Sequence, residues 1–155
     1  MISITVLMAI AILGAVEDDV PLNVAWAEHA FSESAEPTVT CPFSFVYGGR
    51  PSLELLPSWE CRVEVETLTE QYRRSLIFTD PATGLEVRAV AIVCTDSPGV
   101  DWTIYFTNKG AVDTPILEQV LALDTAFACE AGASVTFHSL RSTGGVDDWM
   151  PFSQL

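Results

Sequence analysis

The fold is decided by segments between Cys61 and Leu140: CRVEVETLT (61–69), QYRRSLIFT (71–79), LEVRAVAIV (85–93), DWTIYFTN (101–108), PILEQVLALDTAF (115–127) and ASVTFHSL (133–140). These segments are rich in Val, Ile, Thr, Phe and Tyr, and several alternate apolar and polar side chains with a period of two. Almost no helical periodicity interrupts them. The sequence therefore predicts an all-β fold, an antiparallel β-sandwich.

Turn residues separate most of these segments. Asp80-Pro-Ala-Thr-Gly84 is a hairpin signal, because Pro81 favours a type I turn and Gly84 can take the left-handed conformation after it. Asp96-Ser-Pro-Gly99 and Asn108-Lys-Gly110 have similar turn chemistry. Turns at short intervals between short strands favour an antiparallel sandwich over a βαβ fold.

The N-terminal residues 1–15 differ in character from the rest. Ile2–Ala15 is a continuous apolar run of about 14 residues, which is shorter than the roughly 20 that a spanning helix needs. Its length fits the hydrophobic region of a signal peptide, and the protein would then be secreted or periplasmic. No Lys or Arg precedes the run, so a buried strand or a mis-assigned start in a cytoplasmic protein remains the alternative.

The remaining chain divides into an acidic segment and a sandwich domain. Residues 16–40 are acidic and turn-rich, and we expect irregular structure there, with a short helical turn or an irregular crossing at Pro21–Phe31. Residues 41–155 are predicted to form the β-sandwich domain. The apolar ending Trp149–Phe152 predicts that this sandwich is incomplete at its C-terminus, and an unpaired edge would favour aggregation.

The charge balance excludes several partners. With 7 basic and 21 acidic residues, the chain has a formal net charge of −14, which repels the phosphate backbone of nucleic acids. Lys109 is the only lysine, and no basic cluster indicates binding to a membrane surface. We therefore expect no nucleic-acid partner and no membrane contact apart from the signal-like segment.

The cysteines and histidines give no metal-site pattern. No C-x-x-C pair is present, which argues against structural zinc. We expect mostly buried, free thiols, but an exported chain could form two disulfides in any of three connectivities; the cysteines are Cys41, Cys61, Cys94 and Cys129. His29 and His138 lie in different segments, and an ordinary solvent-facing or hydrogen-bonded role is expected for His138. No metal or cofactor is predicted.

No catalytic motif is present either. A nucleophile elbow, a phosphate-binding loop and an H-E-x-x-H helix are all missing from the sequence. Asp147 and Asp148 are neighbours, and adjacent side chains on an extended chain point in opposite directions. They are therefore a poor match to a glycosidase pair, whose carboxylates lie about 5 to 10 Å apart. The prediction is that this chain contains no catalytic residue.

Tryptophans next to acidic residues give the candidate binding residues. Sugars stack on aromatic rings and donate hydroxyl hydrogen bonds to carboxylates. Trp59 and Trp102 flank strands, so we expect them in the core. Asp148 and Trp149 are the candidates for substrate binding, because core packing explains Trp149 least.

Several segments, in order, resemble a known family. They are GLEV (84–87), PGVDW (98–102), FTNKG (106–110), PILE (115–118) with Leu123-Asp124, and also PFSFVYGGRPS (42–52) and DDWMPF (147–152). Together they are similar to the N-terminal β-domain of family 36 glycoside hydrolases, the α-galactosidase or melibiase group. The resemblance covers residues 42–155, with Cys94 and Cys129 as departures from the family's pattern.

The resemblance implies an accessory role in carbohydrate metabolism. Such enzymes place a β-supersandwich ahead of a (β/α)₈ barrel, in which two aspartates hydrolyse the O-glycosidic bond with retention. Because this sequence ends before any barrel, no catalytic residue is carried over, and the chain alone is expected to be inactive. The resemblance makes the absent barrel the expected partner and a galactoside the expected ligand, approached by Asp148 and Trp149. The alternatives are a free-standing carbohydrate-binding module and a structural sandwich without a ligand.

Overall fold

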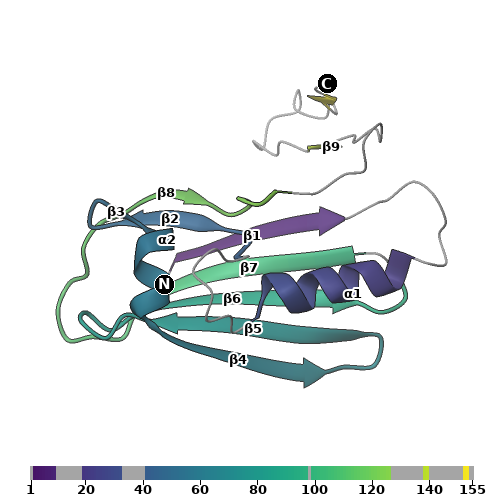
Figure 1. The fold of residues 1–155 in the computed structure, drawn as a ribbon, viewed down its shortest axis with the longest axis horizontal. Helices are drawn as coiled ribbons and strands as arrows, with labels where there is room; N and C mark the ends of the chain where they lie inside the picture. The colour runs from purple at the N-terminus through teal and green to yellow at the C-terminus, as the bar shows by residue number, and fades with distance from the viewer. Residues whose placement is uncertain are drawn as a thin grey trace. The chain divides into compact units, whose positions relative to one another are not determined.

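The computed structural model describes residues 2–9, 19–32, 41–97, 99–126, 138–139 and 152–153 (Figure 1). The chain divides into two units, residues 1–125 and 126–155. In the second unit, the described strands β9 (His138–Ser139) and β10 (Phe152–Ser153) form an antiparallel pair. The first unit contains the sheets and the core that are described below.

The larger sheet of the first unit, here called the main sheet, has five strands, and each neighbouring pair is antiparallel. Its order is β1 (Ile2–Ala9), β7 (Gly99–Asn108), β6 (Leu85–Cys94), β5 (Gln71–Thr79) and β4 (Glu60–Thr67). β4 to β7 coincide with the predicted segments 61–69, 71–79, 85–93 and 101–108. The predicted all-β, antiparallel fold is confirmed.

The predicted hairpin turn at residues 80–84 joins β5 to β6. The Asp80 carboxylate accepts hydrogen bonds from the Ala82 amide (3.0 Å) and the Thr83 hydroxyl (2.6 Å). The Gly84 amide donates to the Asp80 carbonyl oxygen at 2.9 Å, and Gly84 has φ 77°. A left-handed glycine after the turn is the role that the sequence predicted for this position.

The smaller sheet, here called the small sheet, has three strands in the order β3 (Arg50–Pro51), β2 (Ser44–Tyr47) and β8 (Leu117–Leu121). Gly48 and Gly49 have φ 58° and 77°, as a two-residue type I′ hairpin between β2 and β3 requires. The helices α2 (Ser52–Leu55) and η1 (Leu56–Ser58) follow β3. β8 is shorter than the predicted segment 115–127.

The core lies between the two sheets, as in a sandwich. Alternate residues of β7 face it: Val100, Trp102, Ile104 and Phe106, all buried. From the small sheet, the Phe45 ring packs edge-on against the Phe106 ring, with centroids 5.4 Å apart. Trp102 is completely buried, and its indole N–H donates to the Ala122 carbonyl at 2.9 Å. Trp59 is 8% exposed, so the expectation that Trp59 and Trp102 are core residues is confirmed.

The segment 16–40 contains more regular structure than the expected short turn. Asp19–Ala30 forms helix α1, which contacts β6 and β7 of the main sheet (Figure 1). The Phe31 ring, just after the helix, packs against Trp102 with centroids 6.0 Å apart. α1 thus covers the core at one end of β7, and β2 covers the other end. Because tertiary packing supplies most helical stability, the local sequence alone gave a weak signal.

The N-terminal apolar run contributes an edge strand. Residues 2–9 form β1, which pairs with β7 in a register from Ile2 opposite Phe106 to Ala9 opposite Gly99. One of the alternatives considered for residues 1–15, a strand, is therefore present at residues 2–9. Among the described residues, no helix has both the length and the apolar character that are needed to cross a bilayer.

The cysteines in the described ranges are thiols. Cys41, Cys61 and Cys94 form no disulfide and are half-buried, as expected, and Cys129 lies outside the described residues. Burial raises the pKa of the Cys41 thiol to about 12, with a further contribution from the neighbouring Cys61. Cys41 is therefore a neutral packing residue at physiological pH.

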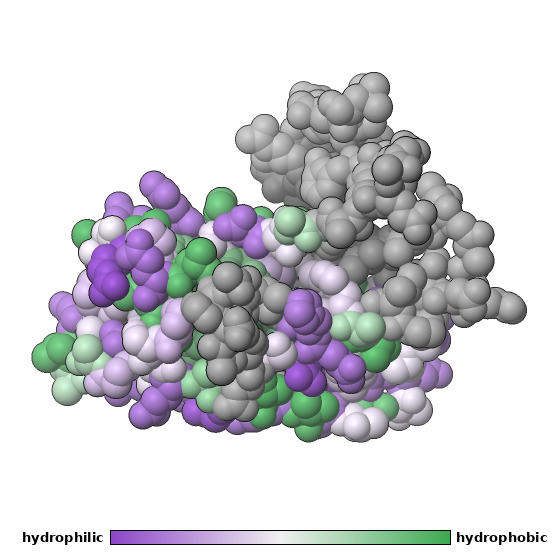
Figure 2. Space-filling view, viewed as in Figure 1, coloured by the Kyte–Doolittle hydropathy of each residue, from purple (hydrophilic) through white to green (hydrophobic). Residues whose placement is uncertain are grey.

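The surface of the protein mixes residue types. Figure 2 shows hydrophilic and hydrophobic residues interspersed over the side in view. Large apolar side chains that are exposed in the described part include Leu53, Val65, Val112, Ile116 and Leu121. Scattered apolar residues are normal for a folded protein and assign no site by themselves.

Candidate functional site

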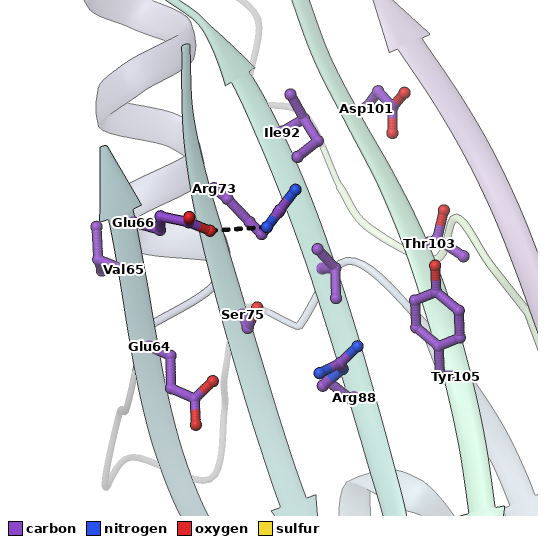
Figure 3. A pocket seen from close by; sticks show the side chains of 11 residues that line it. Glu64, Val65, Glu66, Arg73, Ser75, Arg88, Ile92, Asp101, Thr103 and Tyr105 are labelled. Atoms are coloured by element: carbon purple, nitrogen blue, oxygen red, sulfur yellow. Dashed lines mark hydrogen bonds and ion pairs between the residues drawn. The ribbon is translucent and has the colours of Figure 1, made fainter. Parts of the chain in front are cut away.

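The face of the main sheet that points away from the core carries a hollow of about 500 Å³ (Figure 3). We call this surface the open face. The residues around the hollow come from β4, β5, β6 and β7; they are Glu64, Val65, Glu66, Arg73, Ser75, Arg88, Val90, Ile92, Asp101, Thr103 and Tyr105. Strand alternation places Asp101, Thr103 and Tyr105 here, because the residues between them face the core.

The strand register arranges these residues in rows across the sheet. In the middle row, Ser75 lies opposite Val90, which lies opposite Thr103. One neighbouring row contains Glu66, Arg73, Ile92 and Asp101, and the other contains Ile77, Arg88 and Tyr105. The two outer rows lie about 13 Å apart, since their residues are four positions apart along each strand and a strand rises about 3.3 Å per residue.

Side-chain size explains the hollow. On β5, β6 and β7 the middle row contains short or β-branched side chains, Ser75, Val90 and Thr103, and the rows on both sides include long or aromatic ones such as Arg73, Arg88 and Tyr105. Glu64 of β4 stands at the end of the middle row, opposite Ser75. The short side chains form the floor, and Arg73 and Tyr105 stand on opposite sides of it (Figure 3). The arrangement is a polar trough with an apolar component in its floor.

The Arg88 guanidinium stacks on an aromatic ring at one side of the hollow. Its central carbon lies 5.4 Å from the centroid of the Tyr105 ring, and the two residues are register partners on β6 and β7. Arg88 is exposed, and no carboxylate of the described residues forms an ion pair with it. A cation held over a ring in this way keeps its N–H donors available to a ligand.

Several other charged groups of the open face form ion pairs with one another, whereas Asp101 forms none with the described residues. Arg73 forms an ion pair with Glu66 at 2.7 Å, drawn in Figure 3. Glu86, next to the hollow, accepts from Lys109 at 2.6 Å and lies 3.6 Å from Arg62. Arg73 and Glu66 form an exposed cross-strand pair, which contributes little to stability, whereas the Glu86 carboxylate is buried and is compensated by two basic groups.

The structure does not test the residues predicted for binding. Asp148 and Trp149 lie outside the described residues, so the structure does not place them. The open face was not anticipated, although alternation in DWTIYFTN and LEVRAVAIV already put Asp101, Tyr105 and Arg88 at outward positions. The missing information was the register, which brings Arg88 and Tyr105 together.

The chemistry available on the open face is that of binding. Hydroxyl, carboxylate and guanidinium groups surround one aromatic ring, a set of donors and acceptors suited to a polar ligand with an apolar face. Within the described ranges, no cluster of three or more His, Cys, Asp or Glu residues could hold a metal ion. His29 is exposed near the end of α1 and takes no part in the hollow.

Comparison with known proteins gives no match: no protein-family model, no curated protein and no solved structure is significantly similar to this chain.

Proposed function

We propose that this chain is an accessory β-sandwich of an α-galactosidase-like glycoside hydrolase, and that its own activity is to bind carbohydrate on the open face. In this proposal a separate catalytic barrel hydrolyses the O-glycosidic bond, and the present chain is inactive alone. The observation that carries the binding function is the trough floored by Ser75, Val90 and Thr103 beside the Tyr105 ring. β-Sheet faces with such a trough can bind a sugar through one ring and several hydrogen bonds.

The dimensions of the trough support a carbohydrate ligand. Its volume of about 500 Å³ is within the range of about 300–1,000 Å³ found for ligand sites. Tyr105 is half-buried, so part of its ring is available for contact with the C–H face of a sugar. Ser75 and Thr103 provide hydroxyl groups at the floor, and Asp101 provides a carboxylate acceptor at one side.

Two of the segments that carry the family resemblance, GLEV and FTNKG, are in direct contact, which supports the glycosidase part of the proposal. Gly84, at the start of GLEV, accepts a hydrogen bond through its carbonyl from the amide of Lys109 in FTNKG at 3.0 Å. Glu86 and Lys109, from the same two segments, form the ion pair at 2.6 Å. Segments that are linked in this way act as one structural unit where β6 begins and β7 ends.

A binding measurement tests the proposal. The full chain is titrated with neutral and acidic oligosaccharides, and tryptophan fluorescence and calorimetry report binding. The Tyr105→Ala variant should bind about tenfold more weakly, because the ring contact is lost. Glu54→Ala is the matched control, since Glu54 is exposed on α2 and pairs only with Arg50 at 3.8 Å. Silence across the oligosaccharides, or equal binding by Tyr105→Ala, would contradict the binding function.

A second experiment separates the accessory role from the alternative of a free-standing carbohydrate-binding module. A catalytic barrel of the α-galactosidase type is supplied in trans, and hydrolysis of an α-galactoside is measured with and without the chain. An accessory sandwich should increase the barrel's activity or associate with it. Sugar binding without any such gain would instead favour the free-standing module, which the presence of the trough within this chain also supports.

A further inference from the structure

We infer that the ligand of the open face is an acidic carbohydrate, whose carboxylate is bound by Arg88. This inference rests on the proposed binding function and specifies its ligand class. It follows from the pairing of the basic residues, from the contact between Arg88 and Tyr105, and from the distribution of charge around the hollow.

Arg88 differs from the other basic residues in its lack of a protein partner. Within the described part of the chain, every other Arg or Lys forms an ion pair or a hydrogen bond: Arg50 with Glu54, Arg62 with Glu64, Arg73 with Glu66, Arg74 with the Phe31 carbonyl, and Lys109 with Glu86. Arg88 forms no ion pair or side-chain hydrogen bond with these residues, and its guanidinium lies over the Tyr105 ring. Its positive charge is therefore available for a ligand, in a chain whose formal charge is −14.

The contact with Tyr105 prepares Arg88 for a carboxylate. Stacking restricts the long arginine side chain, so less conformational entropy is lost when a ligand binds. The central guanidinium carbon lies over the Tyr105 ring, and the N–H groups of a guanidinium lie in its plane. A carboxylate can accept two parallel hydrogen bonds from such a group, which a neutral hydroxyl cannot match in strength.

The glutamates near Arg88 are paired with other basic residues, so their charge does not oppose the binding of an anion at Arg88. Glu64 and Glu66 pair with Arg62 at 3.3 Å and Arg73 at 2.7 Å, and Glu86 pairs with Lys109 at 2.6 Å. Asp101 lies four residues from Tyr105 along β7, a backbone separation of about 13 Å, and forms no ion pair with Arg88. Asp101 is thus placed to accept hydrogen bonds from hydroxyl groups at the far end of the same ligand.

The test uses probes that share the same sugar units, with the carboxylate charge removed in one of them by methyl esterification. The full chain is titrated by calorimetry with an oligogalacturonate and with its methyl ester, which has the same sugar units without the carboxylate charge. The unmodified chain should bind the free acid about tenfold more tightly than the ester, as expected for hydrogen bonds to a charged group. This preference should decrease as salt is added.

Variants assign the preference to Arg88. Arg88→Gln should abolish the preference for the acid while it leaves affinity for the ester within about twofold, and Arg88→Lys should retain part of the preference, because charge remains without the planar fork. Arg50→Gln, which removes an exposed charge elsewhere, should behave like the unmodified chain. If the unmodified chain binds acid and ester equally, this inference is overturned and the proposed sugar binding stands. Failure to bind either probe or any neutral oligosaccharide overturns both, and a preference that survives Arg88→Gln removes the assignment to Arg88.

Discussion

Two glycines show how tightly the main sheet is packed at the edge where β6 begins and β7 ends. A Cβ atom on Gly84 would lie 2.8 Å from the Gly110 amide nitrogen, and a Cβ atom on Gly110 would overlap the Thr83 carbonyl oxygen. Both obstacles are backbone atoms, which cannot rotate away as a side chain does. Glycine at these positions is therefore required by close approach of the two turns.

Gly110→Ala should lower the free energy of unfolding by about 3 kcal/mol, because the new methyl group forces the two turns apart. Urea denaturation followed by tryptophan fluorescence measures the loss. Gly49→Ala is the matched control: Gly49 has φ 77°, but no atom lies within 4 Å of its added Cβ. It should lose about 1 kcal/mol, from backbone strain alone. Equal losses for both variants would show that the close approach has no energetic effect.

Cys41 predicts a pH dependence of stability. Its pKa is raised from the ordinary 9.0 to about 12, so the folded state retains the thiol proton at a pH where the unfolded state loses it. The contribution to stability is complete below pH 9 and is lost as the pH rises toward 12. Denaturation midpoints should therefore fall over this range, and less so for Cys41→Ala. A Cys41→Ala variant with the same alkaline slope as the unmodified chain would contradict this assignment.

At the scale of elements, α1 shows how a weakly patterned segment becomes helical. Ala27 and Phe31 are completely buried, and Asn23 is 1% exposed. The Asn23 side-chain amide donates to the carbonyl oxygens of Cys94, Ser97 and Gly99 at 3.0, 3.3 and 3.1 Å. One side chain thus connects the helix to the loop between β6 and β7.

Asn23→Ala should destabilise the protein by about 1–3 kcal/mol, because the carbonyl oxygens of that loop lose a buried donor. The comparison variant is Ser32→Ala, which removes an exposed hydrogen bond of 2.9 Å to the His29 carbonyl and should change stability by less than about 0.5 kcal/mol. Chemical denaturation gives both values, and hydrogen exchange at residues 94–99 reports the loop directly. Unchanged exchange there in Asn23→Ala would show that the helix does not hold the loop.

At the scale of the whole molecule, the described core belongs to the first unit. Both sheets and every buried residue of the core cluster lie within residues 1–125. Residues 117–124 are part of it, because Ala122 accepts the Trp102 indole hydrogen bond at 2.9 Å and the Asp124 amide donates to the Pro42 carbonyl at 2.7 Å.

A chain ending at Thr125 should therefore fold cooperatively, with a urea midpoint close to that of the full chain. A chain ending at Asn108 lacks β8 and leaves the Trp102 indole without its acceptor, so it should lose the cooperative transition. Circular dichroism and tryptophan emission distinguish the two. Cooperative unfolding of the shorter chain, or loss of it in the longer one, would show that the unit boundary does not correspond to a folding unit.

Local sequence determined the strands and their turns. Alternation in Gly99–Asn108 specifies both the strand and which residues face the core, because successive side chains point to opposite faces. The turn at residues 80–84 and the Gly48-Gly49 turn follow from residues that tolerate the required backbone angles. These features depend on neighbours in sequence, so they could be predicted without the structure.

Only the tertiary structure decided the candidate site. Ser75, Val90 and Thr103 become one row, and Arg88 meets Tyr105, through the register of β5, β6 and β7. Register between these consecutive strands depends on the exact geometry of the joining turns and on the packing of one sheet face against α1 and β2, because a slip of one residue would move every side chain to the other face. The same dependence on packing turned residues 19–30 into a helix and residues 2–9 into an edge strand.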